Sequence, residues 1–345
     1  MDWNEYGAFI VEETKNLLAI DSPSGMTKKA AEHVVARFEA LGYAPQMTRK
    51  DGVLVCLGGS DKENGLLLEA HMDTLGGMVC QIKPNGRLKI TPIGGLRAEN
   101  VETENCRVVT KFDGVIEGTA QLINASTHVN EKYADTQRTF DTIEIVLDEP
   151  VESADDVKKL GIRTGDYVCF EPRTRVTKSG YIKSRFLDDK LSVGILLGYA
   201  RYLKDERITP ERAVYVHITS FEEVGHGGSA SVPAGVTEAI SVDMGCVGEG
   251  LTCDERMVSI CAKDSGGPYH YDVVRGLIAA AEKMGAPYAV DVYPRYGSDV
   301  EATLRAGYDL RHGLIGSGVY ASHGYERSHI EGALATLKTL AGYVK

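Results

Sequence analysis

The pattern of apolar and β-prone residues changes at two places in this sequence, and these changes limit its fold more than any other feature. Up to residue 73, and again after residue 182, helical apolar patterns alternate with runs of β-branched residues. Residues 74–182 instead carry short β-prone pieces separated by Gly, Asn, Asp and Pro. The outer stretches predict one discontinuous α/β domain, residues 1–73 and 183–345. The middle stretch, residues 74–182, predicts an inserted β-rich domain of the small-barrel kind.

The spacing of apolar residues predicts individual elements within this plan. Helices are expected at residues 6–20, 27–41 and 191–203, and after His329. Strands of the α/β domain are expected at residues 53–57, 66–71, 213–220 and 239–243. The insert should contain strands at residues 79–82, 87–91, 107–111, 142–147 and 167–170. The run at 66–71 is almost continuously apolar, which is typical of a strand buried on both faces of a sheet.

Charge and cysteine content exclude several classes of protein. The formal net charge is −11 and Lys and Arg form no cluster, which argues against nucleic acid or an anionic membrane as a partner. No apolar run reaches the roughly 18–20 residues of a membrane span, and the first residues lack a secretory pattern. The 7 cysteines form no Cys-x-x-Cys pair, so they indicate neither a disulfide framework nor a thiolate zinc site. We expect a cytoplasmic protein.

Carboxylates and imidazoles gather where the predicted strands end. Glu222 and Glu223 follow one strand, and Asp243 ends another. His71 and Asp73 stand two apart at the end of a third, which points both side chains to one face if the chain stays extended. Because open α/β sheets bind ligands beyond the carboxyl ends of their strands, these five residues are candidates for one site.

Two further segments offer the same kinds of side chain. Asp188 and Asp189 precede a predicted helix, and His323 lies in a late loop before the final helix. Each candidate also has an ordinary interpretation: a solvated glutamate pair, a helix N-cap for one aspartate, or a loop histidine. His329 is an alternative to His323. At the level of single motifs the sequence leaves these alternatives open.

Taken together, the candidates form a set of nitrogen and oxygen donors that suits zinc, cobalt or manganese. Asp188, Glu223 and Asp243 bring three negative charges, which with one hydroxide balance two divalent ions. Glu222 is then free to take a proton. Two ions about 3.5–4 Å apart can polarise a carbonyl and stabilise an attacking hydroxide, as they do in aminopeptidases.

The order of these motifs resembles the co-catalytic metallopeptidase family of glutamyl aminopeptidases and tetrahedral (TET) aminopeptidases. The segments that carry the resemblance are Ala70-His71-Met72-Asp73, Leu187-Asp188-Asp189-Lys190, Glu222-Glu223-Val224-Gly225, Val242-Asp243 and the late His323. The likeness spans nearly the whole chain, including the β-rich insert. It implies a mixed sheet sandwiched by helices, and an insert that serves assembly or substrate gating. It also implies a tetrahedral dodecamer that acts on short peptides.

The resemblance further implies five metal ligands, with His71 and Asp243 at one ion, Glu223 and His323 at the other, and Asp188 bridging both. Two expected ions per subunit follow, zinc or cobalt first and manganese as an alternative.

Three other positions take supporting roles in the same resemblance. Asp73 would orient His71, and Glu222 would be the general base that activates a metal-bridging water. Asp299, in Gly297-Ser298-Asp299, resembles a late family element with a supporting role.

Departures from the family pattern surround the ligands without removing any. They are Thr74 in place of Glu, Lys190 in place of Arg, and His226-Gly227 in place of a Leu-Arg type pair. Hydrolase chemistry is therefore better supported than any substrate preference. The roles of His128 in the insert and of the cationic side chains near the motifs, Arg185, Lys190 and Arg295, stay open.

The sequence thus predicts a cytoplasmic dinuclear aminopeptidase. Within enzymes, the alternative is an amidohydrolase or deacylase on the same scaffold, acting on an acylated amino acid or a small modified dipeptide. The alternative of another class is a non-catalytic oligomeric assembly with a vestigial site. Glycan hydrolysis by paired carboxylates is disfavoured because His71 and His323 would have no role in it.

Overall fold

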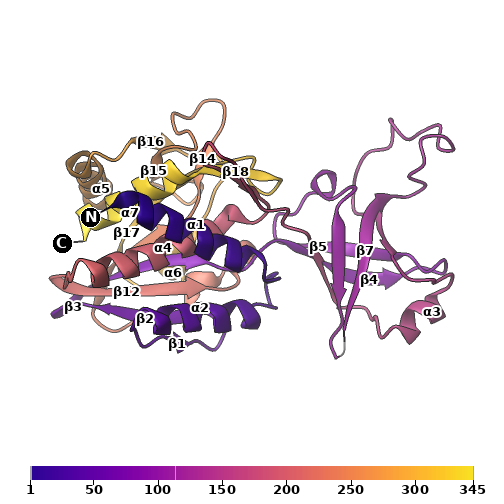
Figure 1. The fold of residues 1–345 in the computed structure, drawn as a ribbon, viewed down its shortest axis with the longest axis horizontal. Coiled ribbons are helices and arrows are strands. Elements are labelled where there is room, and N and C mark those ends of the chain that lie inside the picture. Colours follow the sequence, from indigo (N-terminus) through magenta and orange to yellow (C-terminus); the bar gives the residue numbers. More distant parts are fainter. Residues whose placement is uncertain (1, 113, 345) are drawn as a thin grey trace. The chain divides into compact units, whose positions relative to one another are not determined.

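The structure is a computed structural model, and it describes residues 2–112 and 114–344. The chain divides into two compact units (Figure 1). The α/β unit comprises Met1–Thr74 and Arg173–Lys345, and the barrel unit comprises Leu75–Pro172. Each unit has its own sheet, so the two are described separately.

The α/β unit is built on a 12-stranded sheet whose main path runs β1-β2-β12-β3-β13-β17-β18-β11-β10. Its strands are β1 (Gln46–Met47), β2 (Val53–Gly58), β3 (Asp61–His71), β10 (Arg175–Val176), β11 (Tyr181–Ser184), β12 (Arg212–Thr219), β13 (Val236–Val242), β14 (Gly245–Val247), β15 (Val258–Lys263), β16 (Tyr288–Val292), β17 (Arg311–Tyr320) and β18 (Glu326–His329). Its α-helices are α1 (Trp3–Leu18), α2 (Lys28–Ala40), α4 (Leu187–Asp205), α5 (Tyr271–Met284), α6 (Asp299–Arg305) and α7 (Ile330–Tyr343). Pairings of both directions occur, since β3 is parallel to β12 and β13 while β2 is antiparallel to β12.

Both faces of the central strand β3 are covered. Leu66 and Leu68 belong to the main hydrophobic core, which also holds Leu197 of α4 and Leu337 of α7. The intervening Leu67 belongs to a second core with residues of α6 and β17. Successive side chains of a strand point to opposite faces, so the apolar run of β3 is a strand between two layers. The predicted mixed sheet sandwiched by helices is confirmed.

Helices α1, α4 and α7 pack against one another, as Figure 1 shows. The helices predicted at 6–20, 27–41 and 191–203 correspond to α1, α2 and α4, with ends displaced by at most four residues. Of the residues described, none lies in a helix that combines the length and apolar character needed to cross a membrane.

The barrel unit is a closed barrel of six strands in the order β4-β5-β8-β7-β6-β9. Its elements are β4 (Gly76–Ile82), β5 (Leu88–Ile93), β6 (Asn105–Val109), β7 (Val115–Leu122), β8 (Ile143–Leu147), the short helix α3 (Ala154–Lys159) and β9 (Tyr167–Phe170). The expected small barrel is therefore present. Strand β7 was not predicted, because its buried positions are Gly118, Ala120 and Leu122, of which only the last is strongly apolar.

The second boundary of the barrel unit lies after Pro172, ten residues before the boundary expected after residue 182. Residues 175–184 form β10 and β11, which pair with each other and, through β11, with β18 of the large sheet. These short strands resemble the strands of the insert in sequence, so only their pairing assigns them to the α/β unit.

Candidate metal centre

Three neighbouring parallel strands of the α/β unit end at the same edge of the sheet. β12 and β13 flank β3, and both run parallel to it. His71 is the last residue of β3, and Asp243 follows β13 directly. Glu222 and Glu223 begin η2, a 3-10 turn of Glu222–Val224 that comes just after β12. The side chains meet beyond the carboxyl ends of the strands, where open sheets of this type bind ligands.

Two loops bring the remaining candidates to this edge. Asp188 lies at the start of α4 with non-helical backbone angles, φ −74° and ψ 101°, and the peptide bond to Asp189 is cis. Non-helical angles at both Asp188 and Asp189 interrupt the start of α4, so its regular part begins after them. The Asp189 side chain interacts with Ser192 in the following turn, so of the two aspartates it is Asp189 that lies at the position of a helix cap. His323 lies in the loop between β17 and β18.

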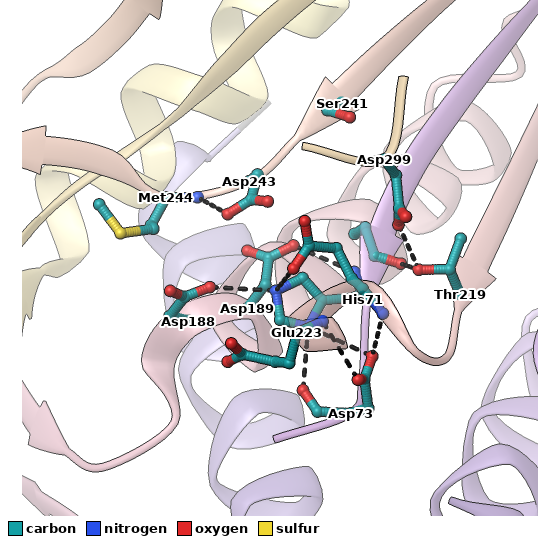
Figure 2. A network of polar contacts seen from close by, with 12 residues as sticks. His71, Asp73, Asp188, Asp189, Thr219, Glu223, Ser241, Asp243, Met244 and Asp299 are labelled. Atoms are coloured by element: carbon teal, nitrogen blue, oxygen red, sulfur yellow. Dashed lines mark hydrogen bonds and ion pairs between the residues drawn. The ribbon is translucent and has the colours of Figure 1, made fainter. Parts of the chain in front are cut away.

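The five candidate ligands form two groups that share Asp188. Figure 2 shows four of them, His71, Asp188, Glu223 and Asp243. In the first group, Nε2 of His71 lies 3.0 Å from Oδ1 of Asp188, and Asp243 completes the set. In the second group, Nε2 of His323 lies 3.5 Å from Oδ2 of Asp188 and 3.6 Å from Oε2 of Glu223. One donor atom from each member of a group lies within 4.8 Å of the others. Each group could hold one ion, with the two oxygens of Asp188 turned to different groups.

The chemistry of these donors fits a pair of divalent cations. Imidazole nitrogens and carboxylate oxygens are the ligands that zinc takes in proteins. Burial and the neighbouring carboxylate of Asp188 raise the pKa of Asp243 to about 7, and the same causes hold the pKa of Glu223 well above its ordinary value. Bound cations would offset this mutual repulsion of buried acids.

Asp73 contacts the residues of the site through both its backbone and its side chain. Its backbone carbonyl lies 2.9 Å from Nδ1 of His71, while its Oδ1 is 3.6 Å away from the same nitrogen. Its carboxylate accepts hydrogen bonds from the backbone N–H groups of Glu222 (3.1 Å) and Glu223 (3.4 Å), and from the hydroxyl of Ser24. The Asp73 carbonyl is thus in contact with the His71 ring, and its carboxylate accepts both backbone N–H groups at the start of η2.

Glu222 stands beside both groups but belongs to neither. Its Oε2 lies 3.7 Å from Nε2 of His71. Burial, reinforced by the charge of Asp243, raises the pKa of Glu222 well above that of an ordinary glutamate. A carboxyl group with a raised pKa in this position is suited to taking up and releasing a proton near neutral pH.

Hydrogen bonds distinguish His329 from His323 and give Lys190 its partners. Nε2 of His329 lies 2.7 Å from the carbonyl of Ser179, and its Nδ1 accepts a hydrogen bond from the N–H of Glu331 at the start of α7. His329 is thus a helix cap, whereas His323 is in a ligand group. The ammonium of the buried Lys190 donates to the carbonyls of Leu17 (3.1 Å) and Ile20 (2.7 Å), at and just beyond the end of α1.

Arg185 and His226 each contact a residue adjacent to a candidate of the site, whereas Arg295 and His128 are exposed. Arg185 is buried and donates to the carbonyl of Gly324 at 3.5 Å, while Arg295 is exposed. His226 stacks on Phe221 with ring centroids 5.0 Å apart. His128 lies on an exposed loop of the barrel unit.

Two buried acids act beside the ligand groups: Asp189, which the sequence offered without a role, and Glu326, which was missed. Oδ2 of Asp189 accepts a hydrogen bond from the backbone N–H of His71 at 3.2 Å. Glu326 accepts hydrogen bonds from the backbone N–H groups of Asp188 at 3.1 Å and His323 at 3.0 Å. Both act on backbone groups, which leave no pattern in a sequence. The position of Glu326 three residues after His323 was the only available signal.

Asp299, at the start of α6, holds the loop that follows η2. It accepts hydrogen bonds from the N–H of Gly228 at 2.6 Å and from the hydroxyl of Thr219, the last residue of β12. Asp299 therefore ties both ends of the Glu222–Glu223 segment to one helix, as the expected supporting residue would.

Comparison with known proteins agrees with this geometry. The family model described as M42 glutamyl aminopeptidase matches residues 51–339. The protein named "Putative aminopeptidase YhfE" of Bacillus subtilis (strain 168) is 41% identical over 335 residues, which cover 97% of either chain. The glutamyl aminopeptidase of Lactococcus lactis subsp. cremoris (strain MG1363) is 26% identical over 227 residues, 64% of this chain and 61% of that protein.

Among solved structures, the Pyrococcus horikoshii TET1 peptidase has the same fold. Its TM-score is 0.84 at 22% sequence identity, over 97% of this chain and 99% of that chain. The family match covers most of the sequence, and the similarity to YhfE extends over nearly its full length. This chain belongs to the M42 family of glutamyl aminopeptidases, which are metal-dependent peptidases.

Proposed function

We propose that this protein is a dinuclear aminopeptidase that removes N-terminal residues from short peptides. The observation that carries the proposal is the position of Asp188, whose two oxygens face two separate ligand groups. A residue shared in this way is suited to bridging two ions. We propose His71 and Asp243 as the other ligands of one ion. Glu223 and His323 are the other ligands of the second ion, with zinc or cobalt expected and manganese as the alternative.

When bound, the two ions would polarise the scissile carbonyl and lower the pKa of the attacking water. The chain itself moves the proton. Glu222 takes a proton from the water as the C–O bond forms, and gives it to the leaving amine as the C–N bond breaks. Asp73 keeps the Glu222 carboxylate beside the ligands, because it holds the backbone N–H groups of Glu222 and Glu223.

The variant Glu222→Gln tests the proposed base. It removes a proton acceptor that belongs to neither ligand group, so each subunit should still bind two ions. The kcat on a dipeptide should fall by about 10²–10⁴-fold. Metal content by mass spectrometry and steady-state kinetics measure the two quantities. Wild-type turnover in this variant would remove Glu222 from the role of base.

A substrate panel separates aminopeptidase from deacylase activity. Dipeptides with a free amino group should be hydrolysed, and the same dipeptides with an N-acetyl group should not. The reverse preference would assign the scaffold to acylated amino acids. A protein that binds no metal and hydrolyses neither set would be a non-catalytic assembly with a vestigial site.

We propose that the chain self-associates into a tetrahedral dodecamer. The Pyrococcus horikoshii TET1 peptidase is described as able to assemble into a tetrahedron or a large octahedral shell, and the fold is shared. The barrel unit is the proposed assembly element. Light scattering coupled to size exclusion gives the particle mass, and a monomer at micromolar concentration would contradict the assembly. A cytoplasmic location is supported by the seven cysteines, which are all free thiols.

A further inference from the structure

Glu326 is a buried acid with an unusual pair of partners. Its side chain lies at the start of β18, and the residue is 2% exposed. One carboxylate oxygen accepts the backbone N–H of Asp188 at 3.1 Å, and the other accepts the backbone N–H of His323 at 3.0 Å. A single carboxylate therefore links the loop that carries the shared ligand to the loop that carries the histidine of the second group.

We propose that Glu326 is a positioning residue that fixes the distance between Asp188 and His323 and so sets the affinity for the second metal ion. The inference rests on the proposed function only in assuming that the two ligand groups bind metal. Glu326 is not itself a ligand, because it belongs to neither ligand group and both of its oxygens already accept N–H groups.

The backbone of the His323 loop explains why such a residue is needed. His323 has φ +61°, in the left-handed region that a residue with a Cβ rarely adopts. Such a conformation persists only when the surroundings hold it. Asp188 has φ −74° and ψ 101°, extended angles that interrupt the start of α4. The hydrogen bond to Glu326 holds the N–H of each residue directly.

The strand that carries Glu326, β18, is paired with the strands that precede both loops. β18 pairs with β11, and in this pairing Glu326 lies opposite Ser184, four residues before Asp188. On the other side, β18 pairs with β17, the strand that precedes the His323 loop. The affinity of a site for its metal falls roughly 10–100-fold when the residues that orient its ligands are changed.

The proposed role of Glu326 requires two acceptor oxygens, one for each N–H group, so a change that removes one acceptor tests it directly. Glu326→Gln has nearly the same shape, but it replaces one oxygen by an amide that donates and cannot accept. One of the two N–H groups then faces another donor and stays buried without a partner. We expect the affinity for the second ion to fall roughly 10–100-fold, and the affinity for the first ion to change less.

The measurement is a titration of metal-free protein with Zn²⁺ in the presence of a competing chelator, which resolves the two dissociation constants. Glu331→Gln is the matched control, because it removes a carboxylate five residues away that pairs with Arg256 at the surface. The control should bind both ions as the wild type does. A Glu326→Gln protein that is folded by circular dichroism and binds both ions with wild-type affinity would overturn the inference.

A second variant keeps the inference testable if the glutamine protein does not fold. Glu326→Asp retains both acceptor oxygens on a shorter stem, so it should fold and lose less affinity for the second ion than an amide variant. If Glu326→Asp lowered the affinities for both ions equally, Glu326 would have no specific effect on the ion bound by His323. The outcomes are also separable from those of the proposed function. Wild-type protein that binds no Zn²⁺ would refute the dinuclear enzyme, whereas two ions bound with the same affinities in wild type and Glu326→Gln would refute only the role of Glu326.

Discussion

Nε2 of His71 lies 3.0 Å from Oδ1 of Asp188, although 117 positions separate the two residues in the chain. The contact joins the end of β3 to the start of α4 at the edge of the sheet. Since the second oxygen of Asp188 faces His323, this aspartate lies between two groups of donors. This arrangement predicts how many metal ions each ligand variant should retain.

Replacing the shared aspartate should cost both ions. We expect Asp188→Ala to retain neither ion, and His71→Ala and His323→Ala each to retain one. Metal content after dialysis, measured by mass spectrometry, gives the stoichiometry. His329→Ala is the control, because His329 caps α7 and should leave both ions bound. An Asp188→Ala protein with two ions would contradict the shared-ligand arrangement.

The buried ammonium of Lys190 should matter for stability and not for metal binding. Lys190→Met removes the donor to two carbonyls at the end of α1, where the helix dipole also favours a positive charge. We expect the free energy of unfolding to fall by about 2–3 kcal/mol. Lys204→Met is the matched control: Lys204 also lies on α4 and donates to a carbonyl, that of Gly42, but at the surface. Its loss should be below about 1 kcal/mol, and equal losses in a urea titration would contradict the prediction.

Glu69 should make stability depend on pH. Burial raises the pKa of Glu69 from 4.5 to about 8. Between these values the folded protein binds one more proton than the unfolded chain, so this contribution is complete below pH 4.5 and is lost as the pH rises through 8.

Glu69→Gln removes this titration. The stability of the variant relative to the wild type should therefore increase with pH, by up to about 5 kcal/mol across the window at roughly 1.4 kcal/mol per pH unit. His217, whose Nδ1 is 3.5 Å from Glu69, has a pKa lowered to about 4 by burial and stays neutral across most of this window. Parallel pH profiles of unfolding for the two proteins would show that Glu69 ionises normally.

Removal of metal should destabilise the α/β unit. A ligand that binds only the folded state at 1,000 times its dissociation constant adds about 4 kcal/mol to stability. Trp3, the only tryptophan of the chain, lies in α1 and reports on this unit by fluorescence. We expect a chelator to lower the unfolding midpoint of the wild type and to leave that of Asp188→Ala unchanged. An unfolding midpoint of the wild type that is the same with and without the chelator would contradict a metal bound in this unit.

Local patterns were enough to find the strand ends and the residues beside them. The apolar run before His71 and the β-branched run before Glu222 mark strands, and parallel neighbours bring their ends together. Asp188 and His323 were candidates by residue type and position alone, and the resemblance supplied their expected roles as metal ligands. The five proposed ligands lie together in the structure with Asp73 and Glu222.

The residues to which the sequence assigned no role bind backbone groups of segments distant in the chain. Glu326 and Asp189 bind N–H groups, which every residue except proline carries, so nothing in the sequence marks their partners. Lys190 could not be assigned because its carbonyl partners at Leu17 and Ile20 belong to another helix end. The boundary after Pro172 depended in the same way on the long-range pairing of β11 with β18.

The wide spacing of the proposed ligands has a consequence for synthesis of the protein. They run from His71, in the first third of the chain, to His323, close to its end. A ribosome releases the N-terminal part first, so a nascent chain that ends before residue 323 lacks at least one donor. The proposed centre can be completed only after the loop of His323 has emerged. Chains terminated before that point would therefore never assemble the full set of ligands.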